Sequence, residues 1–343
     1  MPVDPEFQAA YASDPRFQSD PSNPPVPDPA EEGLSEMDKV RRRGQPIIQA
    51  AKDYYAAQLP PASTYRVEHK TIPVEGATMR LRCIIPAATP DDSTYPILVW
   101  FHGGGWAFGD IEMDDSLLRT ICVELQMCAV NVEYRLAPEH PFPIPINDSF
   151  AAVKWVAENQ SSIQVCIGKG FILGGDSAGA HIATVCAHFA RDDPALAQRK
   201  VTGQLLRQPA VVHPDVCPQE YQAEMRSMAE NKDSPILSRD AMVNAYTVLQ
   251  GPVDDPRVSP LLWPSHAGVA PAFIMHNGAD PLRDDARILE KVLREAGVKT
   301  KSVLYPGMPH GFYYVYPEMP LSRKMYQDLR EGLKWLLELG VEQ

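Results

Sequence analysis

The sequence feature that most constrains the fold is a glycine-rich bend between an apolar run and a helical pattern. Residues 170–174 read GFILG, residues 174–180 read GGDSAGA, and residues 177–191 have the spacing of an amphipathic helix. A strand that turns straight into a helix tolerates only small side chains around the bend, and it exposes the residue at the tip. The pattern therefore predicts an exposed Ser177 hydroxyl beside the N–H of Ala178, although a serine that only caps the helix would give the same pattern.

Residues 98–110, LVWFHGGGWAFGD, place three consecutive glycines after a second apolar run. Glycine costs backbone entropy, so such a triplet indicates that bare backbone approaches something closely. A serine nucleophile produces an oxyanion that needs N–H donors, and a loop without side chains can supply them. We therefore expect Gly103, Gly104 and Gly105 to form an oxyanion hole together with Ala178. The sequence leaves open which of the glycines donate.

A nucleophilic serine needs an acid and a base. Where the serine lies on a bend between a strand and a helix, the acid and the base follow it along the chain in the order Ser, Asp, His. Asp280 directly follows the run AFIMHNGA, and His310 lies in the loop PGMPHGF after the last strand-like run. Asp280 would hold the ring of His310, which would take the proton of Ser177. Asp284 and Asp285 begin the next helical pattern and are expected to interact with its N-terminus. The competing histidines are His213, His266 and His276, the last of which lies inside an apolar strand.

Apolar runs alternate with amphipathic patterns along most of the chain. The runs expected to form strands are 64–74, 78–86, 96–101, 127–134, 170–174, 205–212, 272–276 and 298–305. The helical patterns are 35–59, 114–126, 147–160, 177–191, 284–296 and 322–339. This alternation is typical of an α/β fold in which helices cover both faces of a mostly parallel sheet. Residues 213–252 exceed what a crossover needs, and we interpret them as an insertion above the sheet.

Composition narrows the class of partner. The chain has 343 residues, 44% of them hydrophobic and 22% charged, and a net charge of −12. This acidic balance disfavours nucleic acid and anionic membranes as partners, and there is no run of about 18 apolar residues that could span a bilayer. The acidic N-terminus lacks the apolar region of a secretory signal. Six cysteines without CxxC spacing are interpreted as reduced core thiols, which predicts a cytoplasmic protein without a zinc site.

Five motifs, in this order, resemble the hormone-sensitive-lipase family of α/β-hydrolases. They are HGGGW at 102–106, YRLAPEH at 134–140, GDSAG at 175–179, DPLRD at 280–284 and HGF at 310–312. YRLAPEH is interpreted as a structural brace of the oxyanion loop. The chain departs from the family's usual GDSAGGN at Ala180 and His181. His181 is either a second polar group near the site or a buried histidine with its own partner.

The resemblance implies an α/β-hydrolase fold with a helical cap, and a serine carboxylesterase acting on small to medium carboxylic esters. Ser177 would form an acyl-enzyme that water hydrolyses, without a metal or an organic cofactor. An acyltransferase or cyclase acting on a large natural product would use the same triad with a different acceptor. A catalytically silent small-molecule receptor of the same fold is a further alternative, which the presence of all three triad residues disfavours. The sequence leaves a homodimer open.

The cap is expected to combine residues 1–55 with the insertion at 213–252, above a hydrolase core of residues 56–212 and 253–343. Residues 1–35 are rich in Pro, Asp and Ser, so they form either a tail or an arm on the core. An apolar stripe at helical spacing follows and needs a partner; its members are Ile47, Ile48, Ala51, Tyr54, Tyr55 and Leu59. The insertion offers methionines and tyrosines that suit a pocket roof. The residues expected to line the pocket are Trp106, Phe108, His181, Tyr221 and Tyr246, with packing under the cap as the alternative for Trp106 and Phe108.

Overall fold

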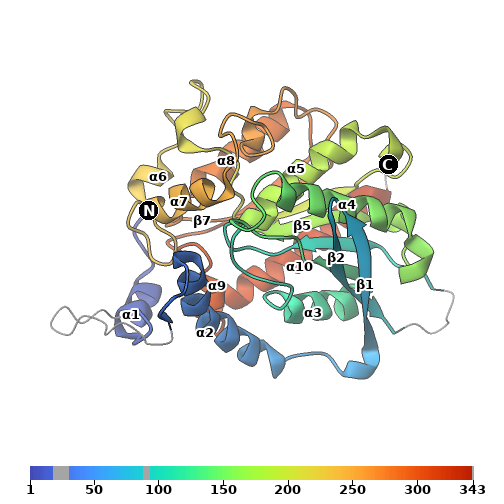
Figure 1. Cartoon of the computed structure of the whole chain (residues 1–343), viewed down its shortest axis with the longest axis horizontal. Helices are drawn as coiled ribbons and strands as arrows, with labels where there is room; N and C mark the ends of the chain where they lie inside the picture. The colour runs from blue at the N-terminus through green and yellow to red at the C-terminus, as the bar shows by residue number, and fades with distance from the viewer. Residues whose placement is uncertain (18–30, 88–92, 342–343) are drawn as a thin grey trace.

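A single eight-stranded sheet organises the structure (Figure 1). The computed structural model describes residues 1–17, 31–87 and 93–341. The strand order is β1-β2-β4-β3-β5-β6-β7-β8; β2 is antiparallel to both of its neighbours and the remaining pairs are parallel. The structure thus confirms the expected α/β class with a mostly parallel sheet. The strands are β1 Tyr65–Val74, β2 Ala77–Pro86, β3 Ile97–Phe101, β4 Cys128–Val132, β5 Phe171–Asp176, β6 Gly203–Arg207, β7 Ala272–Asn277 and β8 Thr300–Tyr305.

Helices cover both faces of the sheet because its central strands are apolar on both sides. In β3, Ile97, Val99 and Phe101 belong to one hydrophobic core, while Leu98 and Trp100 belong to the core on the opposite face. The helices over the first core are α4 (Ile144–Glu158), α5 (Ala178–Asp192) and α8 (Arg283–Glu295). Those over the second core are α3 (Asp115–Leu125) and α10 (Pro320–Val341).

One strand is shorter than its apolar run predicts. The run at 205–212 suggested a long strand, but β6 ends at Arg207. Gln208 takes a left-handed backbone with φ 46°, and Pro209 has no N–H to donate, so the ladder stops. The N–H of Ser177 donates to the carbonyl of Arg207 at 2.8 Å, which places this turn directly beside the serine bend.

Residues 1–17 pack on the core as an arm. The sequence had left open whether this segment is a tail or an arm. Helix α1 (Pro5–Ser13) buries Phe7 completely, and the Phe7 ring meets the Tyr316 ring edge-on with centroids 5.4 Å apart. The N–H of Asp4 donates to the carbonyl of Gly307 at 2.8 Å. The rest of the proline-rich stretch, residues 18–30, lies outside the described residues.

The insertion lies at the end of the molecule away from the β1–β2 hairpin, and the second N-terminal helix starts near that end and runs along the lower edge toward β1 (Figure 1). Helix α2 (Glu36–Ala56) packs on α3 and on the short helix α9 (Phe312–Val315), which follows the His310 loop. The α-helices between β6 and β7 are α6 (Ser227–Glu230) and α7 (Arg239–Leu249), and the remainder of this insertion is irregular or 3-10 chain. The expected helical insertion therefore has only two short α-helices.

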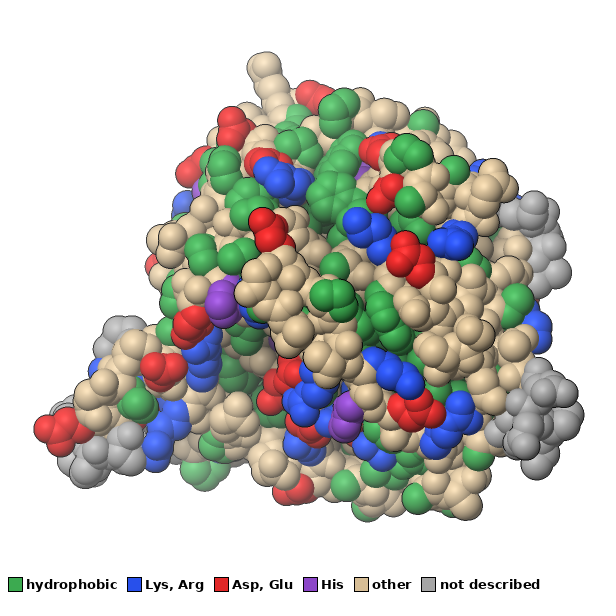
Figure 2. Space-filling view, turned by 45° about the vertical axis from the view of Figure 1, so that its right-hand side comes forward, with side chains coloured by type: hydrophobic (Ala, Val, Ile, Leu, Met, Phe, Trp, Pro, Cys, Tyr) green, Lys and Arg blue, Asp and Glu red, His purple; other side chains and the backbone are tan. Residues whose placement is uncertain are grey.

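All six cysteines are free, and four are buried as expected. Cys166 and Cys217 are partly exposed, and Cys217 packs against the edge of the core. Within the described ranges, no helix is both long and apolar enough to cross a bilayer. On the face that Figure 2 shows, Lys and Arg side chains alternate with Asp and Glu instead of forming a broad basic area.

The close crossing of α5 and β3 gives a first prediction. A Cβ placed on Gly179 would lie 2.0 Å from the carbonyl oxygen of Phe101, a main-chain atom that cannot move aside. Gly179→Ala should therefore lower the free energy of unfolding by about 3 kcal/mol through overpacking. Chemical denaturation measures the loss, with Gly168→Ala as a control because its new Cβ would meet nothing closer than 3.8 Å. Equal unfolding free energies for the two variants would contradict this packing.

Candidate active site

The bend between β5 and α5 presents the Ser177 side chain at the tip of a strained turn. Ser177 has φ 53° and ψ −115°, a conformation that costs a residue with a side chain free energy and that persists only where the surroundings impose it. The close approach of Gly179 to β3 imposes it here. The turn also brings the N-terminus of α5, with the N–H of Ala178, to the same point as the serine hydroxyl.

Ser177, His310 and Asp280 form a continuous hydrogen-bonded line. His310 Nε2 lies 2.9 Å from Ser177 Oγ, and His310 Nδ1 lies 2.7 Å from Asp280 Oδ2. Because a carboxylate only accepts, Nδ1 carries the ring proton, and Nε2 of the neutral ring accepts from the serine hydroxyl. The second carboxylate oxygen of Asp280 accepts from the N–H of Leu282 at 2.8 Å, which fixes the orientation of the carboxylate. All three side chains of the line are buried, so Ser177 is not exposed on the surface as the bend predicted, although it lines a cavity.

The charges around His310 set its affinity for a proton. Burial alone would lower the pKa of the ring, but the attraction and hydrogen bond of Asp280, together with the charge of Asp176, raise the pKa above its ordinary value. The buried Arg207 acts in the opposite direction. A histidine with these surroundings is suited to take a proton from a hydroxyl at neutral pH.

The glycine loop after β3 divides into two parts. Gly104 and Gly105 line the cavity in front of Ser177, whereas Gly103 packs on the carboxylate of Asp176. Gly104 needs its missing side chain: its φ is 111°, and a Cβ there would lie 2.2 Å from the carbonyl oxygen of Phe108. The structure therefore brings two of the three expected glycines to the cavity and leaves Gly103 behind it.

The YRLAPEH segment and α2 hold this loop from behind. The hydroxyl of Tyr134 donates to the carbonyl of His102 at 2.7 Å, and the two rings are stacked with centroids 4.4 Å apart. Arg41 of α2 donates to the carbonyls of Ala107 at 2.8 Å and Ala137 at 3.0 Å, and it pairs with Glu139. The loop is thus fixed by the motif that the sequence suggested and also by an N-terminal arginine that no motif indicated.

A cavity of about 410 Å³ opens in front of Ser177 and His310. Two helices that are distant in sequence, α2 and α7, both contribute to its lining. The lining residues on α7 recur at helical spacing and are Ala241, Met242, Asn244, Ala245 and Val248. The apolar lining from α2 and from the loops is Met37, Val40, Ile47, Ile48, Phe108, Ile236 and Leu237. The cavity is therefore suited to an apolar acyl or alcohol group.

Of the five residues expected in the pocket, the structure places only Phe108 on the cavity wall. Trp106 is fully buried and donates from its indole nitrogen to Nδ1 of His181 at 3.1 Å, so both side chains lie behind the wall. Burial lowers the pKa of His181 to about 4, and the ring stays neutral at physiological pH. His181 is thus a buried histidine with its own partner.

The two expected pocket tyrosines also lie elsewhere. Tyr246 occupies the face of α7 that packs on Trp106 and His213, because the cavity face of this helix carries the alanines and Val248. Tyr221 lies under the ammonium group of Lys291, 5.4 Å from the ring centroid, and does not line the cavity. Helical spacing alone did not reveal which face of the helix would turn toward Ser177.

The acidic pair after Asp280 has a different role from the one expected. Asp284 accepts from the backbone N–H groups of Arg226 (2.9 Å) and Ser227 (2.8 Å), so it holds the insertion and does not only interact with the N-terminus of α8. Asp285 accepts from the N–H of Val211 at 2.9 Å, and burial raises its pKa to about 8.

The three competing histidines have partners outside the Ser177 site. His266 is hydrogen-bonded to His188, and His276 contacts the carbonyl of Arg283. His213 accepts a hydrogen bond from the backbone N–H of Asp215.

Gln208 is a site residue that the sequence analysis missed. Its side-chain amide donates to Asp176 (3.1 Å) and to Tyr313 (2.7 Å), and its carbonyl accepts from the N–H of Gly311 (3.1 Å) and from Asn277 (2.6 Å). It therefore ties the residue before Ser177 to the residue after His310. The proline that follows Gln208 was the available signal, since a polar residue before proline inside an apolar run indicates a turn.

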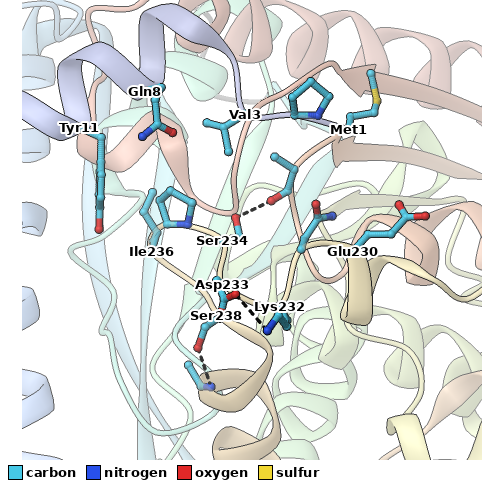
Figure 3. Close-up of a pocket in the computed structure, with 15 residues that line it drawn as sticks. Met1, Val3, Gln8, Tyr11, Glu230, Lys232, Asp233, Ser234, Ile236 and Ser238 are labelled. Atoms are coloured by element: carbon cyan, nitrogen blue, oxygen red, sulfur yellow. Dashed lines mark hydrogen bonds and ion pairs between the residues drawn. The ribbon is translucent and has the colours of Figure 1, made fainter.

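A second pocket, of about 650 Å³, lies between the N-terminal arm and the insertion (Figure 3). Tyr11 of the arm faces Ser234 and Ile236 of the insertion across it. Ile236 lines both cavities, so the loop that carries it separates them. Ser177 lines the first cavity and not this one, so the described site lies on the other side of that loop.

The fold, the serine bend and the Ser–His–Asp line define an α/β-hydrolase. A family model described as alpha/beta hydrolase fold matches residues 98–314, and the chain belongs to this family. Among its relatives is versiconal hemiacetal acetate esterase of Dothistroma septosporum, 35% identical over 71% of this chain and 74% of the relative. Another is carboxylesterase NlhH of Mycobacterium tuberculosis, 36% identical over 72% and 75%. These matches confirm the family resemblance that the motifs carried.

Solved structures extend the similarity over nearly the whole chain. The crystal structure of a vibralactone cyclase superposes with a TM-score of 0.91 at 38% identity, covering 99% of this chain and 96% of that one. A hyperthermophilic esterase from the archaeon Pyrobaculum calidifontis superposes with a TM-score of 0.77 at 28% identity, covering 98% and 99%. The fold that the sequence predicts is therefore also that of solved relatives.

The surroundings of His310 predict its titration independently of any activity. We expect an NMR titration to give His310 a pKa above the ordinary value of about 6.5, because Asp280 stabilises the charged ring. Asp280→Asn should lower this pKa, since burial and Arg207 then act against a weaker attraction. His181, with its pKa near 4, serves as the internal reference. An unchanged His310 pKa in the variant would contradict the proposed pairing.

Proposed function

We propose that the protein is a serine carboxylesterase in which Ser177 is the nucleophile, His310 the base and Asp280 the orienting acid. The observation that carries the proposal is the hydrogen-bonded line of these three residues at the floor of an apolar cavity. The relatives named as esterases support the same activity. A catalytically silent receptor would not need these three residues to be hydrogen-bonded in this way, so the observed line disfavours that alternative.

The geometry accounts for each step of ester hydrolysis. Ser177 Oγ attacks the ester carbonyl carbon while its proton passes to Nε2 of His310. The negative charge that forms on the carbonyl oxygen is stabilised by the N–H groups of Gly104, Gly105 and Ala178. His310 returns the proton to the leaving alcohol, and the acyl group stays on Ser177. Water then attacks this acyl-enzyme with His310 again as base, releasing the carboxylic acid.

Residues 1–55 and the insertion are expected to act as the cap that sets substrate size; α2 and α7 are the helices of these segments that line the cavity, whereas α1 lines the second pocket. The 410 Å³ volume of the cavity is suited to small and medium esters. In this proposal the substrate contacts Phe108 and the apolar residues that α2 and α7 contribute to the lining. A cytoplasmic location and a homodimer stay predictions from the sequence.

A second candidate is ring closure by intramolecular acyl transfer, favoured by the near-complete superposition on vibralactone cyclase. The acyl-enzyme would form as above, but a hydroxyl of the same substrate would attack its carbonyl carbon. The bond to Ser177 Oγ then breaks, and a lactone leaves in place of an acid. Product analysis with a hydroxyl-bearing ester distinguishes the two reactions, since hydrolysis gives the hydroxy acid and ring closure gives the lactone.

The nucleophile is tested by Ser177→Ala, which should lower the rate of ester hydrolysis by a factor on the order of 10⁶ while the protein stays folded. Hydrolysis of p-nitrophenyl esters measures the rate. Ser149→Ala is the control, because it removes a different buried hydroxyl, one that bonds to the carbonyl of Pro145 in α4. A fluorophosphonate should label Ser177 stoichiometrically, and labelling of another serine would refute the assignment.

The acid is tested by comparing Asp280→Asn with Asp285→Asn. The first variant removes the carboxylate that orients His310, a loss of about 10⁴ in kcat in a well-studied triad. Asp285 already has a pKa raised to about 8 by burial, so it is mostly protonated at pH 7 and asparagine resembles it closely. We expect Asp285→Asn to keep most of the activity. Equal losses in kcat for the two variants would mean that the acid has been assigned wrongly.

A further inference from the structure

Three consecutive backbone carbonyls of the loop that carries Asp280 accept hydrogen bonds from side chains of the insertion. We call residues 279–281 the acid loop and residues 226–234 the docking segment. The three pairs are Ala279 O with Ser234 Oγ (2.5 Å), Asp280 O with Asn231 Nδ2 (2.9 Å) and Pro281 O with Ser227 Oγ (2.6 Å). Each carbonyl thus accepts from a side chain 45 to 54 residues away in sequence, and the carbonyl of Asp280 also accepts from the N–H of Arg283 at 3.1 Å.

The docking segment is held in return by the chain that follows the acid loop. Asp284 accepts from the first two N–H groups of the segment, and its own N–H donates to Ser227 Oγ at 3.1 Å. Arg283 pairs with Glu230 at 2.9 Å. Ser227 lies in the short helix α6, whereas Asn231 and Ser234 lie in the turns that follow it, and all three side chains reach the acid loop. This two-way bonding fixes the acid loop and the docking segment against each other.

Most of this contact is closed to water. Ser227 is 1% exposed, Asn231 is 7% exposed and Asp280 is 1% exposed, so water cannot replace the donors Ser227 and Asn231 without rearrangement. Ser234 is partly exposed, because it also lines the second pocket. The carboxylate of Asp280 bonds to His310 on one side and to the N–H of Leu282 on the other. The position of this carboxylate therefore follows the position of the backbone that the docking segment holds.

We propose that the docking segment positions the acid of the triad, with Asn231 and Ser234 as positioning residues for Asp280. This inference rests on the proposed function, because it assigns to the cap insertion a part in catalysis beyond enclosing the substrate. A displacement of about 1 Å in a catalytic group can lower the rate by about 10²-fold. Loss of a side-chain donor to the acid loop should thus reduce turnover although none of these side chains touches the substrate.

The structure supplies a matched pair of serines for the test. Ser234 and Ser238 line the same second pocket, and both hydroxyls make one hydrogen bond (Figure 3). Ser234 donates to the acid loop, whereas Ser238 accepts from the N–H of Ala241 at the start of its own helix, α7. Ser238→Ala therefore weakens the insertion without touching the acid loop. Ser234→Thr keeps a hydroxyl at the position under test.

The experiment measures the rate at which a fluorophosphonate labels Ser177 across a pH series, together with the His310 pKa by NMR and the thermal unfolding of each variant. Ser234→Ala and Asn231→Ala should lower the labelling rate at high pH by about 10-fold to 100-fold. They should also lower the His310 pKa, because Asp280 and Asp176 raise it while burial and Arg207 lower it, and a displaced Asp280 raises it less. Ser234→Thr should restore the wild-type values.

The control separates positioning from general weakening of the cap. Ser238→Ala should lower the unfolding temperature about as much as Ser234→Ala while leaving the labelling rate and the His310 pKa unchanged. Wild-type labelling and pKa values in Ser234→Ala, or equal changes in Ser238→Ala, would overturn the proposal. A wild-type protein that no fluorophosphonate labels would overturn the proposed function instead. The NMR pKa values would still decide whether the docking segment controls the contact between Asp280 and His310.

Discussion

The site depends on one buried cation, Arg207 at the end of β6. Its guanidinium is fully buried and pairs with Asp176 and Asp114, each at 2.9 Å. Tyr313 and Tyr314 donate to the same two carboxylates, at 2.5 Å and 2.9 Å. Removing one partner of such a pair costs about 3–5 kcal/mol because a charge is left uncompensated in a medium of low polarity. The cluster therefore fixes the end of β5, the start of α3 and the His310 loop relative to one another.

Gln208 extends this constraint from the fold to the chemistry. The buried ion pairs fix the backbone of β6 as far as Arg207, and the left-handed Gln208 then directs its amide between Asp176 and Gly311. These two residues are the chain neighbours of Ser177 and His310. The 2.9 Å contact between the serine and the histidine is thus set by groups that take no part in proton transfer. The docking segment has the corresponding position on the side of Asp280.

The sequence predicted the parts of this molecule that are determined by local rules. Strand–helix alternation gave the sheet and its covering helices, and the glycines around Ser177 and after His102 marked backbone that must come close to other backbone. Long-range pairing carries no such local mark. Arg207 and Gln208 lie inside an apolar run that predicted a longer strand. Asp284 and Asp285 lie at the start of a predicted helix, where acidic residues are expected without any other partner. Their actual partners are distant in sequence, which is why the local pattern could not name them.

Local sequence patterns likewise mark the groups that carry the chemistry of the site but not the residues that determine its selectivity. An oxyanion hole requires bare backbone and a proton relay requires specific titratable groups, so both leave motifs. A cavity wall requires only apolar side chains of suitable size, and many residues satisfy that requirement. Helices α2 and α7 accordingly form the cavity without any recognisable motif, and the phase of α7 decides that Ala245 and not Tyr246 faces it. The side chains that form the cavity walls therefore carry no motif, whereas polar residues of the same segments bond to the glycine loop, as Arg41 of α2 does, and to the loop of Asp280, as Ser234 does.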